Sequence, residues 1–567
     1  MVAGRLGWRV TLGAPHVAMA MAALALLVLV VLPLASLAWG SVSQDGRLTL
    51  EHFRQAFGDR LYLRALANSL ILGLWTGVLS VVIGLPLAWA TSRTDLPAKG
   101  FVRLTAHLAY VTPPFLTAIA FVTLLSPNAG ILNRFVRDVL GVPSLVFNVF
   151  SMPGLVLVTV LHTFPYVYLL AAGALESVDA SLEESARLLG AGRLRTFARV
   201  TAPLVAPAVL SGALLAFVNA IALFGSQAII GLPGRVFTLP TRIYTLFDYP
   251  PQYGLASALS IAFVAVTVLA LALQRRYLGA RSYVTVSGRG ERRALVELGR
   301  ARGPLLLFCG AVFVVAVLLP YLALLAVSLS RSWGLTFWQN LTLAHYRFVL
   351  LDYEVTRRAM LNSFLLASAA ATLAVGLGSV IGWLDLRTGL PGRRWLDYAS
   401  LVPLGLPGIV VAVALIQFWL RVPLPLYGTL LIILLAYVGR FIPLGVRAAS
   451  ASLRQLDPAL EETARVTGAG WARTMRRITL PLIRPGLLAG WLLVFVPAIQ
   501  ELSASILLFS AESMTLAVAV YNLYESGRLE AVSALAIVSM VLIGLALLLA
   551  TRLGRAGAPA DRPPVSA

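Results

Sequence analysis

Residues with catalytic potential are few in this sequence, and they do not form a recognisable site. A P-loop for ATP hydrolysis needs a glycine-rich turn followed by Lys and then Ser or Thr, but the single lysine, Lys99, lies in the segment DLPAKGF. The five histidines are scattered and lack the ligand partners three or four residues away that metal sites use. The sequence therefore predicts no enzyme activity, no metal site and no bound cofactor, and the energy source must be a separate subunit or an ion gradient.

Polar side chains inside apolar segments are the next candidates, because burying them in lipid is costly. His162 in LHTFPY aligns with Arg440 in VGRFIP. Glu501 lies in PAIQELSAS, and the corresponding stretch of the first half contains Asn219 and Gln227. We hypothesise that His162, Asn219, Arg440 and Glu501 line a pathway through the membrane, with Glu501 near Arg440. The alternative is that these groups hydrogen bond one helix to another, or lie closer to a membrane interface.

A tyrosine motif also occurs twice, after the fifth apolar run of each half of the chain. Tyr244-x-Leu-Phe-Asp248 is similar to Tyr521-x-Leu-Tyr-Glu525. One interpretation is an aromatic belt at the level of the lipid headgroups, which is common. The functional interpretation is an external gate, or a docking rim for a substrate-binding protein.

Two polar islands interrupt the apolar sequence, at residues 179–207 and 457–485. They align without a gap, and roughly half of their positions are identical. In the second island Asp457 is a suitable N-cap and Gly468 breaks the helix, so the sequence predicts a short helix, a glycine corner and a second short basic helix that Pro481 ends. A single island of this kind could be a basic loop facing anionic lipid, but a gapless duplicate argues against that reading.

Membrane spans must position all of these residues. Of the 567 residues 59% are hydrophobic and only 12% are charged, which excludes a soluble globular protein. Apolar runs of about twenty residues, the length that a bilayer requires, predict an all-α polytopic membrane protein with about twelve transmembrane helices. The runs lie near residues 17–39, 66–90, 104–125, 154–175, 205–230, 254–273, 305–328, 362–384, 397–420, 427–448, 486–508 and 529–550.

The distribution of arginine predicts how the chain is oriented. The net charge of +21 does not indicate a nucleic-acid partner, because the arginines cluster in short loops between apolar runs. These loops follow the second, fourth and sixth run of each half, whereas the alternate loops are poorer in charge or mixed in sign. By the positive-inside rule both termini and both polar islands are predicted to be cytoplasmic.

The two halves of the chain repeat one another beyond the islands. RTDLP at Arg93 corresponds to RTGLP at Arg387, and Pro113 corresponds to Pro407. With six spans in each half, the two repeats are predicted to run parallel, related by an axis along the membrane normal. The first half alone carries an extra external segment near residues 126–150. The predicted division is a first repeat at 1–278, a cytoplasmic linker at 279–303, a second repeat at 304–555 and a disordered tail at 556–567.

Each polar island resembles the EAA signature of the permease subunits of ABC importers. In the second island the matching residues are Glu462-Thr463-Ala464, Gly468 and Ile478-x-x-Pro481. In the first island they are Glu184-Ser185-Ala186, Gly190 and Val200-x-x-Pro203, at the same spacing. The family has alanine at the second position of the triplet, where this chain has Ser185 and Thr463.

The resemblance implies a fused-dimer permease with the type I ABC importer fold, in which each island is a coupling helix that docks in a groove of an ABC ATPase subunit. It implies two copies of that subunit, which bind ATP and Mg, and an external or lipid-anchored substrate-binding protein. It also implies a multi-pass protein of the bacterial plasma (inner) membrane. The ATPase-coupling residues would be Glu184, Ala186, Gly190, Pro203, Glu462, Ala464, Gly468 and Pro481.

Two further segments bear on the nature of the cargo. FGSQAIIGLPGRVFTLPTRIYTL and ELSASILLFSAESMTLAVAVYNLYE are most similar to the ferric-iron branch of the permeases. This resemblance implies ferric iron, with thiamine, aminoethylphosphonate or another small solute as alternatives. An ion-coupled secondary transporter with two parallel halves would also explain the repeat and Glu501, but it gives no reason for the twin islands.

Overall fold

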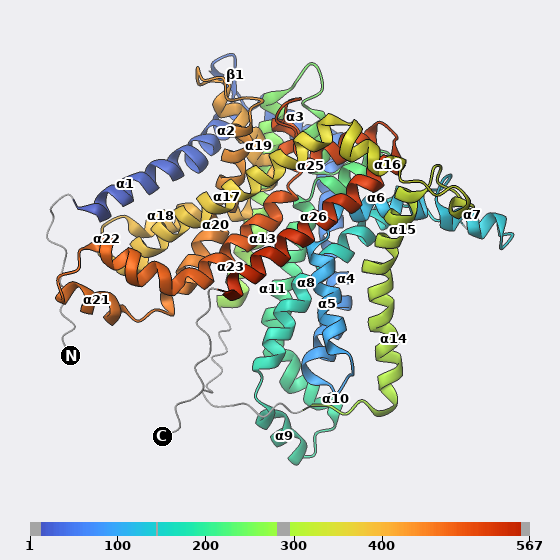
Figure 1. The fold of residues 1–567 in the computed structure, drawn as a ribbon, viewed down its shortest axis with the longest axis horizontal. Coiled ribbons are helices and arrows are strands. Elements are labelled where there is room, and N and C mark those ends of the chain that lie inside the picture. The colour runs from blue at the N-terminus through green and yellow to red at the C-terminus, as the bar shows by residue number, and fades with distance from the viewer. Residues whose placement is uncertain (1–12, 143, 145, 280–294, 557–567) are drawn as a thin grey trace. The chain divides into compact units, whose positions relative to one another are not determined.

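The computed structural model describes residues 13–142, 144, 146–279 and 295–556, and in this part of the chain the regular elements are helices apart from one small hairpin (Figure 1). The chain forms two compact units that are not continuous in sequence. Among the described residues, unit one comprises those within 1–48, 353–519 and 538–567, and unit two comprises those within 49–352 and 520–537. The predicted tail, apart from its first residue, and most of the predicted linker lie outside the described residues.

Unit one contains most helices of the second half of the chain together with the first span of the first half. Its elements are α1 (Ala14–Leu26), η1 (Leu27–Val31), α2 (Leu32–Val42), the hairpin of β1 (Ser43–Gln44) and β2 (Arg47–Leu48), α17 (Glu354–Arg387), α18 (Arg393–Leu401), η8 (Val402–Gly405), α19 (Gly408–Trp419), α20 (Leu430–Arg454), α21 (Pro458–Val466), α22 (Trp471–Thr474), η9 (Met475–Thr479), α23 (Leu480–Ile499) and α24 (Ser505–Leu508). Two further helices, α25 (Leu516–Glu525) and α26 (Leu529–Ala556), are shared between the two units.

Unit two contains the remaining helices of the first half and the first span of the second half. Its elements are α3 (Glu51–Gly58), α4 (Arg60–Arg93), α5 (Lys99–Val111), α6 (Pro114–Leu125), α7 (Ile131–Asp138), α8 (Met152–Ser177), α9 (Ala180–Leu188), α10 (Arg193–Thr196), η2 (Phe197–Thr201), α11 (Ala202–Ala222), η3 (Gln227–Gly231), α12 (Leu239–Thr245), α13 (Tyr253–Gly279), η4 (Gly299–Ala301), α14 (Arg302–Phe313), η5 (Val314–Leu318), α15 (Leu319–Leu329), η6 (Phe337–Gln339), α16 (Ala344–Arg347) and η7 (Phe348–Asp352).

The leading span of each half packs within the unit formed by the other half. In unit one α1 contacts α17 and α18, and α2 contacts α19. In unit two α14 contacts α4 and α5, and the Tyr321 hydroxyl of α15 lies 2.8 Å from the Thr112 hydroxyl. Each compact unit therefore draws on both halves of the sequence, and the boundaries at 1–278 and 304–555 stay a prediction about the sequence repeat.

The membrane spans agree in number with the sequence prediction. Ten helices are long and apolar enough to cross a membrane, and two bent helix pairs raise the count to 12 among the described residues if each pair is one span. The bent pairs are α5 with α6, at 98°, and α18–η8 with α19, at 114°. Both breaks lie at the aligned prolines Pro113 and Pro407, whose rings remove a helical hydrogen bond. The all-α polytopic fold is confirmed.

The fifth span of each half begins earlier than predicted. The sequence predicts that Pro203 and Pro481 end a separate short helix, and this is wrong. The helix runs without a break from Phe197 to Ala222 in one half and from Trp471 to Ile499 in the other. A π-helical turn (η2 or η9) directly precedes the segment with each proline, and this turn accommodates the missing N–H without ending the helix.

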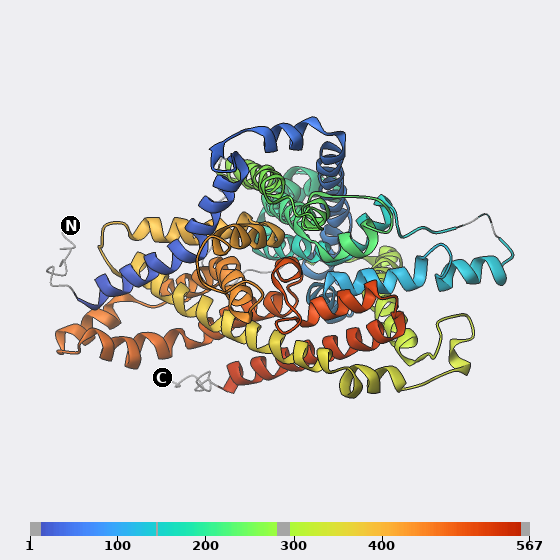
Figure 2. The ribbon, with the colours of Figure 1, turned by 90° about the horizontal axis from the view of Figure 1, so that it is seen from above.

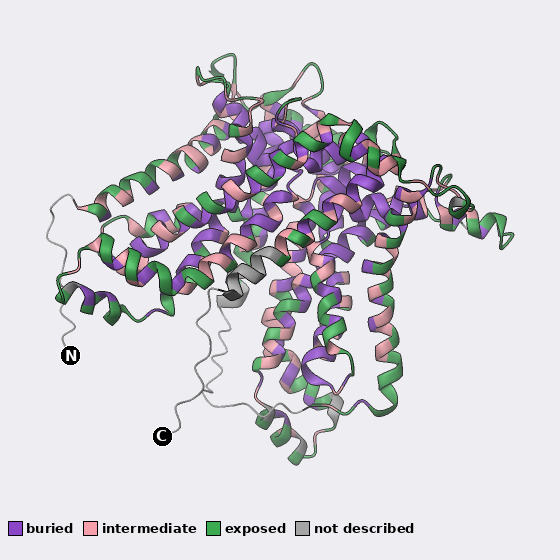
Figure 3. Cartoon of the chain, in the orientation of Figure 1, coloured by how far each residue is buried: buried purple, intermediate pink, exposed green. Residues whose placement is uncertain are grey.

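The core of each unit is a set of three long helices that correspond in the repeat. In unit one α17, α20 and α23 pack together, and in unit two α4, α8 and α11 do so (Figure 1). Buried residues concentrate along these contacts (Figure 3). A Cβ at Gly378 or at Gly445 would overlap the backbone of the facing helix, so small residues allow the close approach that stabilises membrane helices.

The extra segment of the first half contains helix α7, which extends away from the other unit-two helices (Figure 2). Asn133 anchors it: its side-chain amide donates to the carbonyls of Ser126 and Phe147, at 2.9 and 2.8 Å, and accepts from the Phe147 N–H at 2.8 Å. The buried Asn133 amide thus joins the loop before α7 to the loop after it.

Candidate functional site

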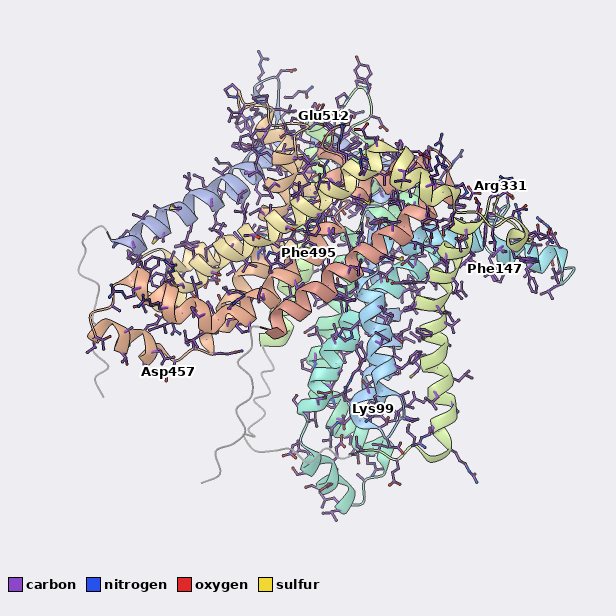
Figure 4. All side chains as sticks on the ribbon, viewed as in Figure 1. Lys99, Phe147, Arg331, Asp457, Phe495 and Glu512 are labelled. Carbon is purple, nitrogen blue, oxygen red and sulfur yellow. The ribbon has the colours of Figure 1, made fainter. Side chains whose placement is uncertain are left out.

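The two polar islands fold in the same way, starting from the same cap. The Asp179 carboxylate accepts from the Ser181 N–H and the Asp457 carboxylate from the Ala459 N–H, each at 2.9 Å. Asp457 stands at the start of α21 (Figure 4). These bonds satisfy N–H groups that the first turn of a helix leaves without a partner. The predicted N-cap Asp457 is confirmed, and Asp179 caps the first island in the same way.

Both islands turn at a glycine in the left-handed conformation. Gly190 has φ +83° and Gly468 has φ +84°. After them, the Ala191 N–H bonds back to the Ala186 carbonyl at 3.0 Å and the Ala469 N–H to the Ala464 carbonyl at 2.9 Å. This is the pattern with which a left-handed residue ends a helix, and side chains other than glycine adopt it at a cost.

The islands present a polar and apolar face to their surroundings. The candidate residues Glu184, Glu462, Pro203 and Pro481 are exposed, as are the two glycines, whereas Ala464 is buried and Ala186 is partly buried. Beside them lie exposed apolar side chains: Leu188, Leu189 and Val466 are 88–89% exposed. A groove next to α21 is lined by Leu460, Thr463, Thr467 and Arg473, among others. Each island therefore offers a face of the kind that a partner protein covers.

Sequence reasoning missed the glutamates that hold the islands in place. Glu183 is 5% exposed and Glu461 is 3% exposed, although the glutamate after each is exposed. The Thr201 hydroxyl donates to Glu183 at 2.7 Å, and the Thr479 hydroxyl donates to Glu461 at 2.8 Å. A signal for this pairing is present in the gapless alignment of the two islands, in which Glu183 aligns with Glu461 and Thr201 aligns with Thr479.

Two arginines complete these contacts from the ends of α4 and α17. Arg93 lies 3.8 Å from Glu183 and donates to the Val178 carbonyl at 2.7 Å. Arg387 lies 3.9 Å from Glu461 and donates to the carbonyls of Leu453 and Leu456. The positive-inside interpretation treats these arginines as loop charges, but Arg93 is 3% exposed and the Arg387 side chain is 9% exposed.

The pathway candidates of the second half do come together. Arg440 in α20 and Glu501, just after α23, form an ion pair at 2.6 Å. The Ala504 N–H donates to the same Glu501 carboxylate at 2.9 Å, and the Tyr437 hydroxyl donates to the Glu501 carbonyl at 3.2 Å. Glu501 is therefore a satisfied, buried carboxylate rather than one that faces lipid.

The pathway candidates of the first half lie in a different environment. His162 is buried in α8 at 8% exposure. Asn219 donates to the Leu215 carbonyl of its own helix at 3.0 Å. Gln227 donates to the Ala220 carbonyl at 2.7 Å and accepts from Thr238. The hydrogen bond of Asn219 lies within α11 and does not join one helix to another. The pathway role of all four candidates stays a prediction.

The tyrosine motifs converge in unit two. The Phe224 ring lies 5.0 Å from the Tyr244 ring and 6.1 Å from the Tyr521 ring, and Tyr521 is hydrogen bonded to Glu525. Burial raises the pKa of Tyr244 to about 12, and the charges of Glu525 and Asp248 add to this. Burial, with the hydrogen bond to Glu525, also raises the pKa of Tyr521. Both phenols are therefore neutral near pH 7, while Asp248 and Glu525 are exposed.

Comparisons with known proteins agree with this arrangement. The family described as binding-protein-dependent transport system inner membrane component matches residues 80–279 and again residues 374–556. A putative ferric transport system permease protein of Haemophilus influenzae is 30% identical over 471 residues, which cover 82% of this chain and 72% of that protein. A ferric transport system permease protein of Actinobacillus pleuropneumoniae is 28% identical, with 84% and 69% covered.

Among solved structures, a bacterial ABC transporter involved in the import of the acidic polysaccharide alginate matches with a TM-score of 0.39 and 19% identity, covering 47% of this chain and 96% of that chain. The two separate family matches fall on the two repeats and include both polar islands. The family that the EAA signature indicates is confirmed: the chain belongs to the binding-protein-dependent transport system inner membrane components, and it carries their domain twice.

Proposed function

We propose that this chain is the membrane-spanning permease of an ABC importer for ferric iron, in which separate ATPase subunits power the movement of cargo that an external binding protein delivers. One observation carries the proposal: the chain has two matching islands with the same cap, the same left-handed glycine and an exposed face. An importer with two identical ATPase subunits requires two docking elements, one for each subunit, and the two islands would meet this requirement.

The islands are the ATPase-docking elements in this proposal. Glu184 and Glu462, with the exposed apolar residues beside them, would contact the ATPase subunits, which hold the ATP and Mg. The arginine pattern supports a cytoplasmic position for both islands and both termini in a bacterial inner membrane. Closure and separation of the two ATPase subunits would then move the spans attached to each island and expose the pathway alternately to the two sides.

Ferric iron is the cargo that the relatives' names support. Two relatives that cover most of this chain are named as ferric transport permeases. Thiamine and aminoethylphosphonate have no support of this kind from these two relatives. The tyrosine motifs with Asp248 and Glu525 would form the external rim where the binding protein docks, and Arg440 and Glu501 would lie along the path.

Uptake of radiolabelled iron tests the cargo. The chain is produced with its ATPase subunit and binding protein in a host strain that lacks its own ferric importer. The expected result is ATP-dependent accumulation of ferric iron, which an excess of thiamine or aminoethylphosphonate does not reduce. Accumulation of one of those solutes in place of iron would overturn the ferric assignment.

A further inference from the structure

Three polar residues at the base of each island recur in both halves of the chain. We call Arg93, Glu183 and Thr201 the first latch, and Arg387, Glu461 and Thr479 the second latch. The hydroxyl-to-carboxylate bonds are 2.7 and 2.8 Å long, and the arginine-to-carboxylate distances are 3.8 and 3.9 Å. The agreement between two segments that fold separately indicates that the contacts are a built feature rather than an accident of one loop.

Each latch joins parts of the chain that belong to different spans. In the first latch Glu183 lies in the island helix α9, Thr201 ends the turn that opens the fifth span, and Arg93 ends the second span. Through its bond to the Val178 carbonyl, Arg93 also holds the connection from the fourth span. In the second latch Arg387 does the same through the carbonyls of Leu453 and Leu456.

Burial makes these contacts costly to break. The side chains of Arg93 and Glu183 are 4% and 7% exposed, and those of Arg387 and Glu461 are 9% and 3% exposed. A carboxylate removed from water is tolerated only when hydrogen bonds and an opposite charge replace its hydration. Separating the island helix from the spans would therefore leave a buried carboxylate without its partners, so island and spans resist moving apart.

We propose that the two latches make each island, with the adjoining ends of the second, fourth and fifth spans, one rigid body, and that this rigidity transmits the motion of the ATPase to the pathway. The inference rests on the proposed function. Glu183 and Glu461 are positioning residues in this proposal, because they bind the buried side of the island helix to the spans. The exposed docking face carries the neighbouring Glu184 and Glu462 instead.

The first latch has a support that the second lacks. The last residues of the linker pair with the RTDLP turn: the Val296 N–H donates to the Arg93 carbonyl at 2.8 Å, and the Leu298 N–H donates to the Asp95 carboxylate at 3.0 Å. Arg302 pairs with Asp95 at 3.1 Å. The second half has Gly389 in place of Asp95 and cannot form these side-chain contacts. Damage to the second latch should therefore have the larger effect.

Replacing each threonine with valine tests the latch, because valine keeps the shape and removes only the hydroxyl. The complex of the chain with its ATPase subunits is reconstituted in nanodiscs, and ATPase activity is measured with and without the ferric-loaded binding protein. We expect Thr479→Val to keep assembly and basal activity but to lower the stimulation by about tenfold, the scale of a hydrogen bond to a charged group. Thr201→Val should lower it less, and the matched controls Thr479→Ser and Thr201→Ser should retain it.

A distance measurement separates rigidity from a general loss of structure. Spin labels at Ser181→Cys and Gly100→Cys, in a Cys309→Ser background, report the distance between the first island and the start of α5, which follows the second span. We expect one narrow distribution in nucleotide-free and ATP-trapped complexes, and a broader, nucleotide-dependent one with Thr201→Val. If a valine variant does not assemble, Glu183→Asp or Glu461→Asp, which keeps the charge but shortens the reach, is expected to lose stimulation in its place.

The outcomes distinguish this inference from the proposed function. Stimulation of the double variant T201V/T479V within about twofold of the unmodified complex would overturn the latch, as would a labelled distance that does not respond to Thr201→Val. An unmodified complex that the loaded binding protein does not stimulate at all would instead overturn the proposed function.

Discussion

Arg440 and Glu501 form a 2.6 Å ion pair between α20 and the end of α23, with side-chain exposures of 20% and 7%. Removing one partner of a buried pair typically costs about 3–5 kcal/mol, because the other charge is left without compensation. We expect Glu501→Gln and Arg440→Gln each to lower the unfolding temperature, and the double variant to recover most of the loss. Thermal unfolding of the purified chain in detergent provides the measurement.

The same variants separate a structural role of the pair from a pathway role. If the pair lies on the pathway, the double variant folds normally and still transports its cargo poorly. Normal transport by a stable double variant would remove Arg440 and Glu501 from the pathway and leave them as a contact between helices.

Gly408 is required by this ion pair. A Cβ at position 408 would lie 2.8 Å from the Glu501 carboxylate oxygen and 2.8 Å from the Ser503 Cβ. We expect Gly408→Ala to displace Arg440 or Glu501 and to cost about 1–3 kcal/mol, as overpacking of a core does. The matched control is Gly376→Ala, since no atom lies within 4 Å of a Cβ there. If the unfolding curves of Gly408→Ala and Gly376→Ala coincided, the claim that a side chain at position 408 disturbs the ion pair would be contradicted.

The left-handed glycine of each island determines the direction of the chain after the island helix. Gly468 has φ +84°, and no atom lies within 4 Å of a Cβ built there. Gly468→Ala therefore causes backbone strain of about 1–2 kcal/mol but no steric clash. Together with Glu462→Ala, Gly468→Ala should abolish stimulation of the ATPase while the protein still inserts in the membrane. The control is Gly470→Ala, where φ is −67° and space is open. Full stimulation of the double variant would count against the docking role of the island.

The tyrosine and carboxylate cluster of unit two is expected to serve the binding protein. Glu525 is exposed and accepts a hydrogen bond from the buried Tyr521. Exposed charges at the rim of an interface act mainly on the association rate. We expect Glu525→Gln to raise the concentration of binding protein that gives half-maximal ATPase stimulation, with a weaker dependence on salt. Glu512→Gln, which changes an exposed carboxylate outside the motif, is the control, and equal effects of the two substitutions would contradict the specific role.

Local signals in the sequence predict much of this structure. Apolar runs predict the spans, Asp457 predicts its cap, and Gly190 and Gly468 predict the corners, because each depends only on nearby residues. The buried position of Glu183 and Glu461 could not be predicted in this way. Adjacent residues on a helix point about 100° apart, and only the packing of α9 and α21 against distant spans decides which of two neighbouring glutamates faces inward.

Other features depend on contacts between distant parts of the chain. The apolar run of α1 does not indicate that it packs within the unit of the second half, because nothing in a uniformly apolar segment specifies a partner. The extension of the fifth helix through Pro203 depends on the π-helical turn before it, for which the sequence carries no clear signal. The hypothesis that Glu501 lies near Arg440 succeeds because both were costly to bury alone.

The dependence of transport on a separate motor tests the central claim most directly. The chain is reconstituted in liposomes with and without its ATPase subunits, and uptake of iron from the loaded binding protein is followed with ATP inside and with imposed proton or sodium gradients. We predict uptake only when the ATPase subunits and ATP are both present. Uptake by the chain alone, driven by an ion gradient, would contradict the claim that the two islands connect this permease to an ATP-driven motor.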